Sequence, residues 1–153
     1  MWSFFLTALG VVTADQLTKW WIVEHLKPGQ SLFEAGIFSI ARSLSPNTGA
    51  AFGLFRGQQL ALTIVAIAGV CFLLFYAFVI RRQFPSVDNL LTRIALGLVL
   101  GGIIGNLIDR LRFGGVTDFI SIGWWPAFNI ADSGIVVGAI IFAYFLLSLV
   151  RKH

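Results

Sequence analysis

Four long apolar segments restrict the possible folds of this chain more than any other feature. They lie near residues 3–24, 58–80, 93–111 and 132–150, and each is long enough to cross roughly 30 Å of hydrocarbon. Because lipid offers the backbone no hydrogen bonds, a segment that crosses it must be helical. Only 12% of the 153 residues are charged, about half the share in a soluble domain. We therefore expect a single membrane domain over residues 1–153, an all-α fold with four transmembrane helices.

The first apolar segment predicts a retained helix rather than a cleaved signal peptide. No basic residue precedes it, it contains Asp15 and Lys19, and it lacks a convincing cleavage site between small residues. Asp15 and Lys19 are four residues apart, so a helix places them on one face, where they can form an ion pair.

The positions of the basic residues predict the orientation of the helices. Five of the eleven flank the ends that would lie on one side of the membrane: Arg81, Arg82, Arg93, Arg151 and Lys152. Four would lie on the other side: Lys27, Arg42, Arg56 and Arg112. The bias is modest, but the positive-inside rule makes the first side cytoplasmic. We therefore expect both chain ends, and the loop between the second and third helices, in the cytoplasm.

The two outer segments should have structure of their own. In residues 27–57, Phe38 and Ile40 alternate with Ser39 and Ala41, which predicts a small β-sheet on the membrane surface between the first and second helices. Residues 112–130 contain Trp124-Trp125-Pro126, and we expect this segment to lie along the interface, where tryptophan is enriched.

Glycines in the last two apolar segments favour close helix packing. Gly97, Gly101 and Gly105 recur at four-residue spacing, and Gly134 and Gly138 repeat it in the last segment. Small residues at this spacing let helix backbones approach in lipid. Packing alone is a sufficient explanation for Gly97 and Gly138.

The polar residues of the apolar segments fall in one layer. The cytoplasmic halves of all four segments are almost purely apolar. The polar residues occupy the outer halves of three segments: Asp15, Lys19, Asn106, Asp109, Arg110 and Asp132. Ionisable groups are costly inside a membrane and indicate function. A transport pathway would need polar groups across the whole thickness, so the layer favours a site just below the outer surface.

Several kinds of site do not fit this inventory. His25 and His153 lie at predicted membrane boundaries, so a serine–histidine–aspartate triad is not expected. Cys71 lies in an apolar run without a base and is interpreted as a packing residue. The sequence has no pattern for a catalytic zinc or a phosphate loop, and its net charge of +4 forms no stripe typical of nucleic-acid binding. We expect no metal, cofactor or nucleic acid.

Carboxylates remain, and Asp118 and Asp132 are the favoured pair. They lie 14 residues apart, at the ends of a segment that could fold back and bring them together. Two close carboxylates share one proton, so one serves as general base and the other as general acid. The alternatives are that Asp132 only caps its helix and that Asp118 is a solvated loop residue. Asp109 is expected to pair with Arg110, and Asp15 with Lys19 to support the site.

Five blocks of residues resemble one known family. They are Asp15-Gln16 with Lys19, residues 47–52, residues 101–110, residues 116–119 and residues 128–133. In this order, and with four apolar segments, they are similar to the bacterial lipoprotein signal peptidases, also called signal peptidase II. The resemblance extends over the whole chain. The segment between Trp124-Trp125 and Phe128 is shorter than the family pattern.

The resemblance implies an aspartyl endopeptidase of the bacterial inner membrane. Such enzymes remove the signal peptide from prolipoproteins whose cysteine carries diacylglycerol, and they are inhibited by the cyclic peptide globomycin. Asp118 and Asp132 match the catalytic pair. Further positions match residues around the site: Asp15, Lys19, Asn47, Gly102, Asn106, Arg110, Asn129 and Ala131.

Two other classes of function compete with a peptidase. A proton-coupled carrier would use Asp15, Lys19 and Asp132 as a relay, but it would need polar residues in the cytoplasmic halves. A non-catalytic membrane adaptor would not need Asp118 and Asp132, so it predicts that Asp118→Asn and Asp132→Asn are harmless.

Overall fold

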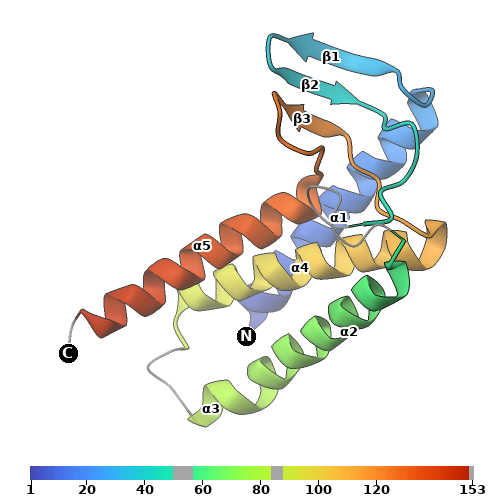
Figure 1. Cartoon of the computed structure of the whole chain (residues 1–153). Coiled ribbons are helices and arrows are strands. Elements are labelled where there is room, and N and C mark those ends of the chain that lie inside the picture. Colours follow the sequence, from blue (N-terminus) through green and yellow to red (C-terminus); the bar gives the residue numbers. More distant parts are fainter. Residues whose placement is uncertain (50–56, 84–87, 152–153) are drawn as a thin grey trace.

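The computed structural model describes residues 1–49, 57–83 and 88–151. The long helices form a bundle with a small sheet at one end (Figure 1). The helices are α1 (Trp2–His25), α2 (Gln59–Phe75), α4 (Leu90–Phe113) and α5 (Ile130–Val150). α2 continues through the π-helical turn η2 (Tyr76–Ile80) into α3 (Arg81–Gln83). The start of α1, the end of α5 and α3 lie at the end of the bundle opposite the sheet (Figure 1).

Three helical stretches of the described residues are long and apolar enough to cross a membrane. They are residues 59–83, 90–113 and 130–149, and they match the second to fourth apolar segments within a few residues. The helix α1 is 24 residues long but is not among them. That α1 is a fourth span stays a prediction.

The central helix α4 packs against α1, α2 and α5, and glycine makes these contacts possible. A Cβ atom added at Gly97 or Gly101 would come within 2.6 Å of a backbone oxygen of α1. One added at Gly138 would collide with the backbone oxygen of Ala95 in α4. The expected close packing of glycine-bearing helices is therefore confirmed.

The sheet contains one strand more than the first outer segment supplies. β1 (Ser31–Ala35) and β2 (Phe38–Ala41) form the expected hairpin. The third strand, β3 (Ile120–Ile122), comes from the second outer segment and pairs antiparallel with β2. The prediction that the whole sheet lies between the first two helices was thus incomplete, because β3 follows α4 and pairs with the open edge of β2.

Further pairing joins the two outer segments next to Asp118. Asn47 and Val116 form an antiparallel bridge with N···O distances of 2.7 and 2.9 Å. The backbone N–H of Ala41 donates to the carbonyl of Phe119 at 2.9 Å. Six residues named above lie outside the described ranges: Ala50, Ala51 and Phe52 of the second block, Arg56, Lys152 and His153.

Candidate active site

Asp118 lies between α4 and β3 and is almost fully buried, with 4% of its surface exposed. The side-chain amides of Asn47 and Asn129 each donate to one of its carboxylate oxygens, both at 2.9 Å. Burial, together with the nearby charge of Asp132, raises the pKa of Asp118 to about 6, although these two hydrogen bonds oppose the rise. Asp118 is therefore not the solvated loop residue of the alternative interpretation.

Asp132 lies in the first turn of α5, but it is not the N-cap of that helix. Asn129 is the N-cap, and its side-chain oxygen accepts from the backbone N–H of Asp132 at 2.9 Å. The Asp132 carboxylate accepts in return from the backbone N–H of Asn129 at 3.3 Å, which completes a capping box. The amide of Asn106 donates to its other oxygen at 2.7 Å. The alternative interpretation, in which Asp132 is itself the N-cap, places the start of the helix three residues too late.

Both carboxylates face one cleft of about 780 Å³. Asn47, Asn106 and Arg110 also line it. Apolar groups make up most of the remaining wall, among them side chains of the Trp124-Trp125-Pro126 segment and of α5. The cleft thus brings a few polar groups together in mainly apolar surroundings, as ligand and active sites often do.

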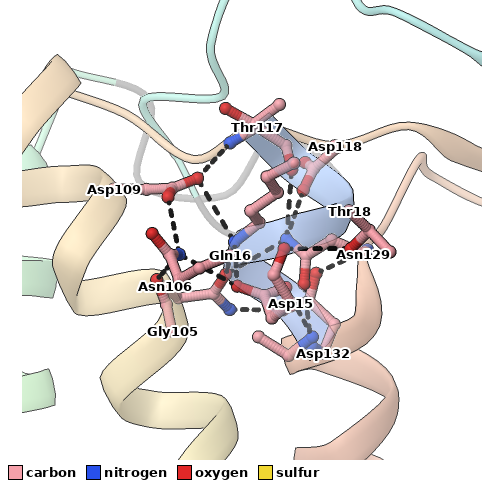
Figure 2. Close-up of polar contacts among 12 residues, drawn as sticks. Asp15, Gln16, Thr18, Gly105, Asn106, Asp109, Thr117, Asp118, Asn129 and Asp132 are labelled. Atoms are coloured by element: carbon pink, nitrogen blue, oxygen red, sulfur yellow. Dashed lines mark hydrogen bonds and ion pairs between the residues drawn. The ribbon is translucent and has the colours of Figure 1, made fainter. Parts of the chain in front are cut away.

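A network of amides connects the two carboxylates. The side-chain oxygen of Asn106 accepts from Asn129 at 3.1 Å, and Asn129 also donates to Asp118. Asn106 in turn donates to Asp132. Figure 2 shows these side chains converging from α4, α5 and the segment before β3. One continuous chain of hydrogen bonds therefore orients both aspartates.

An ion cluster lies behind this network. Lys19 Nζ is 2.8 Å from Asp15 Oδ2, as expected from their spacing. It is also 3.2 Å from Asp109 Oδ2. The expected pair of Asp109 with Arg110 is wrong, because the Asp109 side chain points to α1 while Arg110 lines the cleft.

The remaining predicted positions lie at the contact between α4 and α5. A Cβ atom at Gly102 would collide with the backbone oxygen of Ala131. The backbone N–H of Ala131 donates to Asp15 at 2.9 Å. The structure thus gathers all ten predicted site residues in or directly behind one region, while their roles stay predictions.

Two further residues contact the site and were not predicted from the sequence. Gln16 donates to the carbonyl of Gly105 and to Asp109 Oδ1, both at 3.1 Å, and so joins α1 to α4. Its position next to Asp15 was the available signal. Ser43 donates to the backbone carbonyl of Asp118, and no sequence signal indicates this contact.

The other candidate groups lie elsewhere. His25 stacks on Trp21 near the end of α1, with ring centroids 4.7 Å apart. Cys71 is exposed on the surface of α2, so it is not one of the buried residues of the bundle. Within the described ranges, no group of three His, Cys, Asp or Glu side chains is arranged to hold a metal ion.

Comparison with known proteins identifies relatives along the whole chain. The model of the family described as signal peptidase (SPase) II matches residues 7–148. A lipoprotein signal peptidase of Dehalococcoides mccartyi (strain CBDB1) is 47% identical over 150 residues, which cover 98% of this chain and 90% of that protein. One from Moorella thermoacetica (strain ATCC 39073 / JCM 9320) is 42% identical over 145 residues, with 94% and 92% covered.

The fold is also similar to that of solved proteins. A bacterial membrane enzyme solved by the in meso method at 2.3 Å resolution superposes with a TM-score of 0.85 at 32% identity, covering 97% of this chain and 89% of that one. A second, at 1.9 Å resolution, gives a TM-score of 0.81 at 32% identity, covering 96% and 94%. From the family match and these close relatives, the chain belongs to the signal peptidase II family.

Proposed function

We propose that this chain is an aspartyl endopeptidase that removes the signal peptide from diacylglyceryl-modified prolipoproteins. It cuts before the lipidated cysteine at the outer face of the bacterial inner membrane. One observation carries the proposal: Asp118 and Asp132 reach the same cleft from two different elements, each held by asparagine amides. The names of the relatives supply the substrate class.

The chemistry follows from two carboxylates that share one proton. The ionised carboxylate takes a proton from water, and the resulting hydroxide attacks the carbonyl carbon of the scissile bond. The protonated carboxyl gives its proton to the carbonyl oxygen, which yields a neutral gem-diol intermediate. The carboxyl that took the proton from water then passes it to the leaving nitrogen, and a hydroxyl of the diol returns a proton to the other carboxylate. The C–N bond then breaks, and no covalent enzyme intermediate forms. Because burial raises the pKa of Asp118 to about 6, this aspartate retains a proton more readily than one in water.

The walls of the cleft suit a lipid-anchored peptide. Trp124, Trp125 and Phe128 line one part, and Val136 and Val137 of α5 line another. Val136 and Val137 are also exposed on the helix surface, so acyl chains can lie along α5 in the bilayer while the peptide enters the cleft. Globomycin, a cyclic peptide, would inhibit by occupying the same space.

The orientation is part of the proposal. The cleft lies toward the sheet end of the bundle, and Arg81 and Arg93 lie at the other end, where both contact Asp88. With the basic end in the cytoplasm, both termini are cytoplasmic and the active site faces the periplasm. The cleft then lies at the membrane depth at which the scissile peptide bond of a lipid-anchored substrate lies.

Purified protein in detergent should cleave a diacylglyceryl-modified prolipoprotein. Mass spectrometry should find a product that begins with the lipidated cysteine, and globomycin should prevent its formation. The same precursor without the lipid is the matched control and should remain uncut. Lack of cleavage by folded protein would contradict the proposal and favour the carrier or adaptor interpretation.

A further inference from the structure

A buried ion triad lies directly behind the cleft. It consists of Lys19 between Asp15 and Asp109, with Nζ–Oδ2 distances of 2.8 and 3.2 Å. All three side chains are at least 96% buried. None of them is among the described residues that line the cleft. The triad therefore acts on a substrate only through other residues.

Each carboxylate of the triad accepts a hydrogen bond from the backbone N–H of the residue that precedes one aspartate of the pair. Asp109 Oδ2 accepts from the backbone N–H of Thr117, the neighbour of Asp118, at 2.9 Å. Asp15 Oδ1 accepts from the backbone N–H of Ala131, the neighbour of Asp132, also at 2.9 Å. Lys19 joins these two carboxylates, so the spacing of the two backbone segments depends on one ammonium group.

Lys19 has a third partner that leads to the pair itself. Its Nζ donates to Asn106 Oδ1 at 3.1 Å, which fixes the orientation of that amide. The amide nitrogen of Asn106 is then directed at Asp132 Oδ1, 2.7 Å away. Figure 2 shows the labelled partners of this lysine converging between α1 and α4.

We propose that Lys19 is the positioning residue of the aspartate pair: through Asp15 and Asp109 it fixes their separation, and through Asn106 it directs an amide at Asp132. This inference rests on the proposed function. Among the described residues, Lys19 from α1 and Arg110 from α4 interact by charge with both aspartates, and Asp15 from α1 interacts with Asp132. Asp109 on α4 contacts Lys19 and lies near Arg110. A positive charge nearby stabilises a carboxylate, and a negative charge opposes it.

The charges predict opposite effects for two substitutions. Lys19→Met removes the positive charge but keeps an unbranched apolar chain, so the pair should hold its proton to higher pH. Asp109→Asn removes a negative charge, so the pair should lose its proton at lower pH. We expect the pH profile of cleavage to move by roughly half a unit or more, upward in the first variant and downward in the second.

The kinetic constants should separate positioning from binding. In Lys19→Met, kcat should fall about ten- to hundred-fold, because small displacements of catalytic groups are costly. KM should stay within about twofold, because the triad does not line the cleft.

Lys19→Arg keeps the charge and should keep the pH profile. Asp88→Asn is the matched control: it breaks the contacts with Arg81 and Arg93 at the other end of the bundle and should change neither kcat nor the profile.

A second measurement does not depend on cleavage. NMR titration of ¹³C-labelled aspartate carboxyls should show the Asp118 and Asp132 titrations at higher pH in Lys19→Met than in the native chain. The Thr117 amide signal should move in Asp109→Asn while that of Ala131 stays in place. If Lys19→Met does not fold, Asp109→Asn and Lys19→Arg still decide the question.

The outcomes keep the two proposals apart. A native chain that does not cleave, but shows the expected carboxyl shifts, would overturn the proposed function and keep the electrostatic role of Lys19. A chain that cleaves, with profiles that stay in place or move in the same direction in both variants, would overturn the inference alone. A loss of activity that appears only in KM would also overturn it.

Discussion

Asp118 shows how the site keeps a carboxylate out of water. Only 4% of its surface is exposed, and both oxygens accept hydrogen bonds from neutral amides, those of Asn47 and Asn129. These amides offset only part of the cost of burying a charge. The pKa is therefore raised to about 6, and the site contributes less to stability when this group is ionised.

This raised pKa predicts how stability depends on pH. The folded state holds the Asp118 proton up to about pH 6, whereas the unfolded chain releases it near its ordinary pKa of 3.8. Stability from this group is thus greatest below about pH 4 and falls as pH rises through about 6. Asp118→Asn has no such proton. Relative to this variant, the native chain should lose up to about 3 kcal/mol of unfolding free energy between about pH 4 and 7.5, measured in detergent.

Asp88 supplies a control of opposite sign. Its hydrogen bonds to Arg93 hold its pKa below the usual range, so its contribution is present at neutral pH and is lost as pH falls through that lowered value. Asp88→Asn should therefore cost stability at neutral pH and less in acid. The prediction for Asp118 would be contradicted if the native chain and Asp118→Asn differed by the same unfolding free energy at about pH 4 and at about pH 7.5.

At the scale of elements, the helices could be predicted from the sequence because lipid fixes their length. The segment expected at residues 93–111 is α4, Leu90–Phe113. β3 could not be predicted, because its three residues form a strand only against the edge of β2. The capping box was not predicted, although Asn129 precedes Asp132 by the three residues that this motif requires. The partner of Asp109 was not readable, because Lys19 lies 90 positions away in the sequence.

The contact between α4 and α5 gives a prediction about Gly102. A Cβ atom there would meet the backbone oxygen of Ala131, and Ile135 Cγ1 at 2.6 Å. Gly102→Ala should lower stability by about 1–3 kcal/mol. It should also slow cleavage, because Ala131 precedes Asp132. Gly10→Ala in α1 is the control, since nothing lies within 4 Å of its Cβ position. Thermal unfolding in detergent checks both, and equal effects would contradict the packing account.

At the scale of the whole molecule, the two ends of the helix bundle carry different groups. The sheet lies at one end of the bundle and α3 at the other (Figure 1). Asp118 lies just before β3, whereas Asp88 contacts Arg81 of α3. The site region was predictable because its members fall in one layer of the apolar segments. The hydrogen bonds within the site could not be predicted, because the amide network depends on side-chain directions that sequence periodicity does not give.

The orientation can be checked with single cysteines in a Cys71→Ser chain. Ser31 in β1 and Gln83 in α3 are both exposed. In spheroplasts, a membrane-impermeant maleimide should label Ser31→Cys directly and Gln83→Cys only after the membrane is opened. The reverse pattern would place the active site in the cytoplasm and contradict the proposed orientation.

The central claim is that Asp118 and Asp132 work as one unit, and single-turnover cleavage tests it most directly. Rates should be compared for the native chain, Asp118→Asn, Asp132→Asn and the double variant, all shown to be folded. Each single variant should lose at least about 10³-fold, and the double variant should be no slower, because catalytic groups that act together are non-additive. Full activity in either single variant would contradict the claim, and so would losses that multiply in the double variant.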